Sequence, residues 1–204
     1  MEVDRIGIAG WAVAIVVVAG AASTACGSEN KAGPPPASST AASTSSGVVT
    51  GPPSAQPSDY GFLLIKSNDV GGGLTAPQSP MINPNNAPGV AQLFANADSS
   101  RRLWDTITVA ADPAAATAEL ASTQGGYNGK VTGSWQPLAV GANGVTISGT
   151  SPDNSQAMTV LAFTEGRALV TLEFDSAPTD PIDPAVALDI ARKQDAAVKA
   201  GLHG

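Results

Sequence analysis

The sequence has almost none of the side chains from which catalytic and metal sites are usually built. Its 204 residues include one histidine and one cysteine. The histidine, His203, stands beside the C-terminus, where chains commonly fray, so it is a poor candidate for a dyad or triad that must hold an imidazole in place. One cysteine excludes an intrachain disulfide framework, and one histidine with one cysteine cannot build a zinc site. Stability must therefore come from packing.

Positive charge is also scarce. Ten Lys and Arg residues stand against 17 Asp and Glu residues, for a formal net charge of −7. The cations occur singly or in short pairs, such as residues 101–102 and 192–193, whereas nucleic-acid binding needs clustered cations that contact phosphates. No GxSxG elbow, P-loop or dinucleotide-binding pattern occurs, although Gly71, Gly72 and Gly73 follow one another. We expect no nucleic-acid partner and no cofactor.

A long apolar run, residues 6–22, follows Arg5 at the N-terminus. Spanning a bilayer takes about 20 apolar residues of helix, so the run lies at the lower edge of that length. The small residues 23–25 stand directly before Cys26, as the groove of a signal peptidase requires. The pattern predicts that residues 1–25 are a signal peptide.

The segment around the only cysteine resembles a bacterial lipobox, in which an aliphatic residue, two small residues and a cysteine precede a small or polar residue. Thr24, Ala25, Cys26 and Gly27 match this pattern, and Ser23 stands where Leu, Val or Ile is usual. The resemblance implies cleavage between Ala25 and Cys26 and a diacylglyceryl thioether on the Cys26 thiol. Two acyl chains anchor a protein stably, so we expect Cys26 to hold it on the extracytoplasmic face of the cell membrane.

An uncleaved transmembrane anchor is the alternative interpretation of the N-terminus, and it also places the domain outside a membrane. Residues 26–59 then consist mainly of Gly, Pro, Ala, Ser and Thr. Such a stretch buries too little apolar surface to offset the entropy of ordering it, which predicts a disordered tether. Ser and Thr clusters beside proline are typical of O-glycosylation, and a bare spacer is the other possibility.

Residues 60–204 have the pattern of a single folded domain. A compact apolar run predicts a strand over residues 62–65, and the apolar spacing of residues 88–97 predicts a short helix. Alternation predicts a strand over 106–110. Asp112 is then a typical helix cap and Pro113 a typical first helical residue, so they predict an alanine-rich helix that ends near Ser122.

The sequence pattern in the second half of the domain predicts four short strands and a helix. The strands cover residues 130–140, 144–150, 157–163 and 167–174. A tight turn at Glu165 and Gly166 would place Phe163 opposite Ala168 in a hairpin that is apolar on both faces. The final helix begins at Asp183 and Pro184, extends to about Ala200, and has one apolar face suited to packing on a sheet.

These elements predict an α+β fold: one twisted, mainly antiparallel sheet of about five or six strands, with the alanine-rich helix and the C-terminal amphipathic helix packed on it. The order of elements, with Asp112-Pro-Ala-Ala-Ala after a strand and Arg192-Lys-Gln in the last helix, resembles small secreted mycobacterial lipoproteins. Some of these are compared with PsbP/Mog1-like folds or with sensor-kinase ectodomains. The resemblance implies exposure at the cell envelope.

Few residues stand out as binding candidates. Trp104 and Trp135 are either packing residues or the lining of a pocket for an apolar ligand. Asp175, Asp180 and Asp183 have oxygen ligands suited to Ca²⁺, but capping by Asp183 and the neighbouring prolines favour a rigid connection instead.

Three functions are compatible with this sequence. We favour a non-enzymatic envelope lipoprotein that binds or presents an envelope lipid, glycan or protein. A hydrolase or transferase would need two carboxylates, such as Asp105 and Glu173, in one pocket. A purely structural or antigenic surface protein would have no pocket of about 300 Å³.

Overall fold

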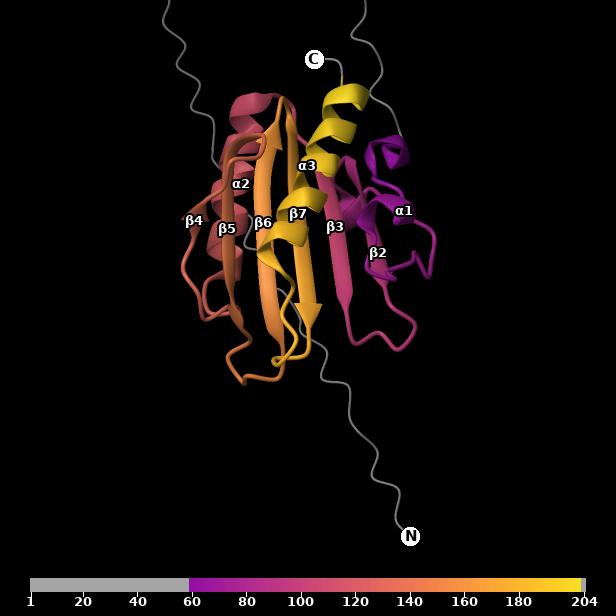
Figure 1. The fold of residues 1–204 in the computed structure, drawn as a ribbon. Coiled ribbons are helices and arrows are strands. Elements are labelled where there is room, and N and C mark those ends of the chain that lie inside the picture. The colour runs from indigo at the N-terminus through magenta and orange to yellow at the C-terminus, as the bar shows by residue number, and fades with distance from the viewer. Residues whose placement is uncertain (1–58, 203–204) are drawn as a thin grey trace, which may run out of the picture. The chain divides into compact units, whose positions relative to one another are not determined.

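The computed structural model describes residues 59–202 (Figure 1). The predicted signal peptide, the cleavage site between Ala25 and Cys26, and the tether up to residue 58 lie outside the described residues. All described elements belong to a compact unit with the bounds Pro52–Gly204. Within residues 59–202, no helix has the length and apolar character needed to cross a bilayer.

Seven antiparallel strands form one sheet in the order β1-β2-β3-β7-β6-β5-β4. The predicted α+β class with an antiparallel sheet is confirmed, and the sheet has more strands than predicted. Two of them, β1 and β4, are two-residue edge strands. No strand was predicted at β1, which is too short for a periodic pattern to reveal, and β4 is the only part of the strand predicted over residues 130–140 that forms. The strand bounds are Met81–Ile82 for β1, Gly89–Ala95 for β2, Arg102–Val109 for β3, Gln136–Pro137 for β4, Ala142–Thr150 for β5, Ala157–Glu165 for β6 and Ala168–Ser176 for β7.

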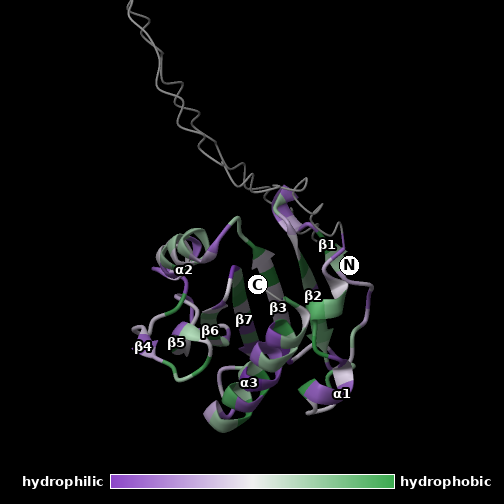
Figure 2. Cartoon of the chain, turned by 90° about the horizontal axis from the view of Figure 1, so that it is seen from above, coloured by the Kyte–Doolittle hydropathy of each residue, from purple (hydrophilic) through white to green (hydrophobic). Residues whose placement is uncertain are grey.

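Two long helices cover opposite faces of the sheet (Figure 2). Helix α2, Pro113–Tyr127, packs on β6 and β7 from one side, and α3, Pro184–Gly201, packs on the same strands from the other. Phe163 belongs to the core beneath α3, whereas its neighbour Ala162 packs with Leu120 of α2. A strand covered on both faces is apolar at nearly every position, which explains the buried run along β6.

Both predicted helix starts are confirmed. The backbone N–H of Ala115 donates to Asp112 Oδ1 at 2.8 Å, and that of Ala185 donates to Asp183 Oδ1 at 2.8 Å. Each capping aspartate is followed by a proline at the start of its helix, where the missing N–H has no cost.

The predicted end of α2 near Ser122 was wrong, because the helix continues through Gly125 and Gly126 to Tyr127. Glycine inside a helix costs only about 1 kcal/mol relative to alanine, so packing can outweigh it. The Tyr127 ring packs edge-on against Trp135, with ring centroids 6.3 Å apart. This contact holds the last turn of the helix on the domain.

The predicted strand over residues 62–65 was wrong. The segment begins with a 3₁₀ turn, η1, at Gly61–Leu63, followed by the short helix α1 at Ser67–Val70. The segment forms no strand because its backbone groups bond to a side chain of α3 instead of to a neighbouring strand. The buried side chain of Gln194 in α3 accepts from the Ile65 N–H at 3.0 Å and donates to the Leu63 carbonyl at 2.7 Å.

The predicted short helix over residues 88–97 was also wrong, since Gly89–Ala95 forms strand β2. Every residue of β2 pairs with β3, from Gly89 opposite Thr108 to Ala95 opposite Arg102. Apolar residues on both faces of a strand leave no alternation to read, so their spacing also fits a helix.

The central hairpin was predicted with the right strands and the wrong register. The turn consists of Gly166 and Arg167, with Glu165 opposite Ala168, so Phe163 faces Val170. Gly166 has φ 54°, a conformation that tight hairpin turns require at this position. Because the shift is two residues, every side chain remains on its predicted face.

Candidate ligand-binding pocket

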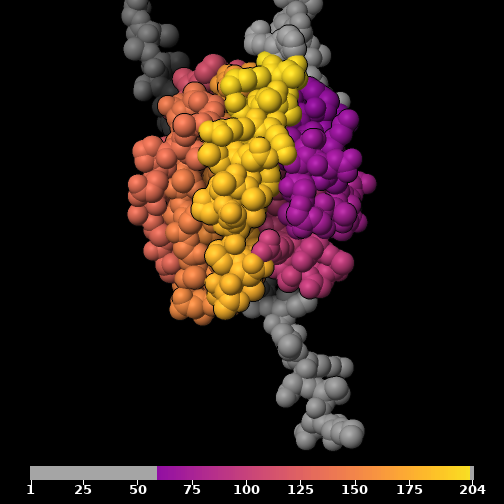
Figure 3. Space-filling model, viewed as in Figure 1, coloured from indigo at the N-terminus to yellow at the C-terminus, as the bar shows by residue number. Residues whose placement is uncertain are grey.

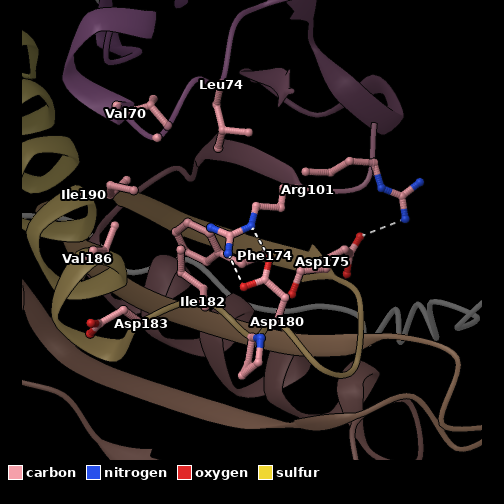
Figure 4. Close-up of a pocket in the computed structure, with 15 residues that line it drawn as sticks. Val70, Leu74, Arg101, Phe174, Asp175, Asp180, Ile182, Asp183, Val186 and Ile190 are labelled. Atoms are coloured by element: carbon pink, nitrogen blue, oxygen red, sulfur yellow. Dashed lines mark hydrogen bonds and ion pairs between the residues drawn. The ribbon is translucent and has the colours of Figure 1, made fainter. Parts of the chain in front are cut away.

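A cavity of about 400 Å³ opens beside the first half of α3, at the end of the sheet where β3 begins and β7 ends. Its lining comes from α1 and the turn that follows, from the start of β3 with the residue before it, from the end of β7 and the segment after it, and from α3 (Figure 4). We call it the α3 pocket. Seven apolar side chains contribute to it: Val70, Leu74, Phe174, Pro181, Ile182, Val186 and Ile190.

The shape of the pocket follows from how α3 lies on the domain. Figure 3 shows the helix side by side with the N-terminal segment of the domain on one face of the molecule. Ile190 is buried in the core beneath α3, but Val186, one turn earlier on the same apolar side, remains 44% exposed. A large apolar side chain left open beside a cavity is a more informative feature than an isolated exposed one.

An ion pair forms the polar side of the α3 pocket. Arg101 donates from Nε to Asp180 Oδ2 at 2.9 Å and from Nη2 to Asp180 Oδ1. The hydrogen bonds from Arg101 lower the pKa of the Asp180 carboxyl below its ordinary value. The pair joins the turn before β3 to the segment before α3, so it connects two loops at the edge of the cavity.

A second pair lies next to it. Arg102 Nη2 is 3.3 Å from Asp175 Oδ2, and both residues belong to the pocket lining. Burial raises the pKa of Asp175, and the nearby Glu173 carboxylate adds to this, while Arg102 opposes it. The other oxygen of Asp175 is buried and has no hydrogen-bond partner within the described residues.

The three aspartates considered for calcium in the sequence, Asp175, Asp180 and Asp183, all line the α3 pocket, but their carboxylates point in different directions (Figure 4). Each is already engaged: Asp180 by Arg101, Asp175 by Arg102, and Asp183 as the cap of α3. Within residues 59–202, no group of three or more Asp, Glu, His or Cys side chains is arranged to hold a metal ion.

The candidate residues Trp104 and Trp135 lie elsewhere, and neither lines the α3 pocket. Trp104 on β3 is opposite Glu173 on β7, and Tyr127 of α2 donates a hydrogen bond from its hydroxyl to Glu173. Trp135 packs against the same tyrosine ring. Both tryptophans are therefore on the side of the sheet that α2 covers, opposite to α3.

The carboxylates Asp105 and Glu173 are also kept apart. Asp105 is opposite Leu172 in the sheet, and Leu172 packs in the core beneath α3. Glu173, the next residue of β7, points to the other face and meets Tyr127. The structure does not bring this pair into one pocket. Asp105 is fully buried, and burial raises its pKa to about 8.

Sequence reasoning missed the α3 pocket because its lining comes from segments far apart in the chain. Two local signals pointed to it. Ile182 is an apolar residue within the polar, proline-rich segment between β7 and α3, and Val186 widens the apolar face of α3 beyond what the sheet covers.

No protein-family model and no curated protein sequence matches this chain. Among solved structures, the chain is similar to the extracellular domain of PknH from Mycobacterium tuberculosis, with a TM-score of 0.48 and 10% sequence identity. The match covers 68% of this chain and 94% of that domain. A likeness at this level concerns the course of the backbone and carries nothing about ligands.

Proposed function

We propose that this protein is a lipid-anchored protein of the cell envelope whose domain binds a small lipid-like ligand in the α3 pocket and catalyses no reaction. The observation that carries the binding function is the open cavity of about 400 Å³ with its seven apolar side chains. Sites for small molecules are mostly apolar and range from about 300 to 1,000 Å³, with a few polar groups that orient the ligand.

The charged groups of the α3 pocket favour binding over catalysis. A general acid or base works best with a pKa near the working pH. The Asp180 carboxyl instead has its pKa lowered by Arg101, so it stays ionised at neutral pH, and Asp183 is used as a helix cap. Arg102 makes a single contact with Asp175, whose pKa is raised by burial, so the preference for binding rests on the Arg101–Asp180 pair. That pair can hold a polar head group without exchanging protons.

The anchor is tested by mass and membrane attachment. We expect the intact protein extracted from membranes to carry a diacylglyceryl group on Cys26 and to lack residues 1–25. The Cys26→Ala variant should lose that mass. The proposal is wrong if the unaltered protein carries no lipid and the variant is retained by membranes to the same extent.

The α3 pocket is tested with the fragment 52–204, which contains the complete sheet and both core helices. The probe is a neutral dye, N-phenyl-1-naphthylamine, whose fluorescence rises in apolar surroundings. Val186→Trp should fill the mouth and weaken dye binding at least tenfold, without disturbing the core, because Val186 is 44% exposed.

Met81→Trp is the matched control, since Met81 is also exposed but lies on the edge strand β1, outside the pocket lining. We expect the control to bind the dye as the unaltered fragment does. Absence of dye binding in the unaltered fragment, or equal binding by the two tryptophan variants, would overturn the proposed binding function.

A further inference from the structure

We infer that the ligand of the α3 pocket is a neutral amphiphile, whose uncharged hydroxyl-bearing head lies at the Arg101–Asp180 pair and whose apolar tail lies along α3. This inference rests on the proposed function and specifies the ligand of the same site. It follows from the balance of charge in the lining and from the hydrogen-bonding groups that the ion pair leaves open.

The charge of the lining disfavours an anionic head. Asp175, Asp180 and Asp183 contribute three carboxylates, whereas Arg101 and Arg102 contribute two guanidinium groups. Each guanidinium already lies against a carboxylate. A fatty-acid carboxylate or a phosphate would have to displace one of these aspartates or sit beside it, and the net charge of −7 on the chain adds a weak repulsion over longer distances.

A cationic head is disfavoured for a different reason. The carboxylates that would attract it are already paired, Asp180 through two hydrogen bonds from Arg101 and Asp175 through Arg102. An ammonium group close to either aspartate would therefore also lie close to a guanidinium. The excess carboxylate belongs to Asp183, which accepts a hydrogen bond from the backbone of α3.

A hydroxyl group meets neither difficulty. Asp180 accepts from Nε and Nη2 of Arg101, and Nη1 has no hydrogen-bond partner within the described residues. The Asp180 side chain is 58% exposed, so its carboxylate oxygens are accessible to a further donor. A ligand hydroxyl can thus accept from Arg101 and donate to Asp180 while their ion pair stays intact.

The apolar residues place the rest of the ligand. Figure 4 shows Val70, Ile190 and Val186 on one side of the cavity and the Arg101–Asp180 pair on the other. A molecule that satisfies both sides has an apolar tail against the helix and a polar head at the ion pair. The partly exposed Val186 leaves the tail side open to solvent, so a tail can enter without unfolding the lining.

The test compares three head groups on the same eight-carbon tail: octyl glucoside, octanoate and octylammonium. Each displaces N-phenyl-1-naphthylamine from the fragment 52–204 at concentrations below the onset of micelles. We expect octyl glucoside to displace the dye at a concentration at least fivefold lower than either ion requires. A preference for octanoate or for octylammonium would overturn the inference.

Asp180→Asn tests the charge argument directly. The substitution keeps the shape of the side chain, removes one negative charge and releases Arg101 to bind an anion. Octanoate should then bind about five to ten times more tightly than to the unaltered fragment, the scale expected for one partly screened charge a few ångströms away. Octyl glucoside should bind somewhat more weakly.

Asp189→Asn is the matched control, because Asp189 is on α3, is 62% exposed, pairs with Lys193 and lies outside the pocket lining. It should change octanoate binding less than twofold, and equal effects of the two substitutions would refute the inferred role of Asp180.

Failure of the dye to bind, or of Val186→Trp to block it, counts against the proposed function. If the dye binds normally but octanoate or octylammonium displaces it at a lower concentration than octyl glucoside, only the inference of a neutral head group is wrong.

Discussion

The buried carboxyl of Asp105 makes the stability of this domain depend on pH, and its substitution measures the effect. Asp105 lies in the middle of β3, beneath α3, with no exposed surface. Neither of its oxygens has a hydrogen-bond partner within residues 59–202. Its cross-strand neighbour Gln92 uses its amide on the carbonyls of Gln78 and Leu93 instead.

The size of this effect on the free energy of unfolding follows from the pKa of Asp105 in the unfolded and in the folded state. Burial raises the pKa of Asp105 from 3.8 to about 8, so between these values the folded state binds a proton that the unfolded state has lost. Stability therefore falls as the pH rises through this window, by about 1.4 kcal/mol per pH unit. At pH 7 the accumulated loss is about 4 kcal/mol, a large part of a typical domain's 5 to 15 kcal/mol.

Asp105→Asn keeps the shape and removes the charge. The variant fragment 52–204 should be up to about 4 kcal/mol more stable than the unaltered fragment at pH 7, and the gain should shrink by about 1.4 kcal/mol per pH unit toward pH 5. Urea unfolding at pH 5, 6 and 7 measures it. The exposed Asp189→Asn control should change stability by less than about 0.5 kcal/mol. An equal gain at all three pH values would refute the reasoning.

Urea unfolding of the same fragment tests four further substitutions. Gln194→Leu removes both side-chain hydrogen bonds to the backbone of the first turn and should cost about 2 to 4 kcal/mol, so a change below 1 kcal/mol would contradict its bridging role. Gly89→Ala should cost more than about 2 kcal/mol, because a Cβ there would lie 2.1 Å from the Ile107 carbonyl oxygen. Gly125→Ala meets no atom within 4 Å and should instead stabilise by about 0.5 to 1 kcal/mol; any loss would show that the backbone of this turn needs glycine. Asp112→Ala should cost about 1 kcal/mol, and no cost would mean that the cap is unimportant.

The parts of the fold that were predictable are those determined by neighbours in the chain. A capping aspartate followed by proline specifies a helix start from two adjacent residues, and Asp112 and Asp183 both behave accordingly. The hairpin of β6 and β7 was recognisable because both strands are continuous apolar runs joined by a short turn. The two-residue error in its register came from choosing between Glu165 and Gly166 as the first turn residue.

The parts that were not predictable depend on partners distant in the sequence. Strand β2 exists because β3 pairs with it at every residue, and nothing within Gly89–Ala95 reveals that pairing. The 3₁₀ turn at the start of the domain depends on Gln194, which follows Leu63 by 131 residues. Sequence periodicity predicted the apolar face of the final helix and could not show which backbone groups Gln194 would bond.

The α3 pocket illustrates the same limit for function. Trp104 and Trp135 drew attention because tryptophan is rare and large, yet they lie on the α2 side. The pocket is lined instead by ordinary apolar residues and by two Arg–Asp pairs. One of these pairs joins Arg101 and Asp180, which are 79 residues apart in the chain. Only the tertiary structure makes these residues neighbours.

One helix connects the start of the described domain with its pocket. The chain enters the domain at Tyr60 and η1, which pack against the far end of α3, where a Cβ on Gly201 would meet Leu63. Val186, at the mouth of the pocket, lies 15 residues earlier on the same helix, about 20 Å away at 1.5 Å per residue. The start of the described chain and the pocket therefore lie near opposite ends of α3. Gln194, between them, secures the entry segment to the helix that forms the pocket wall.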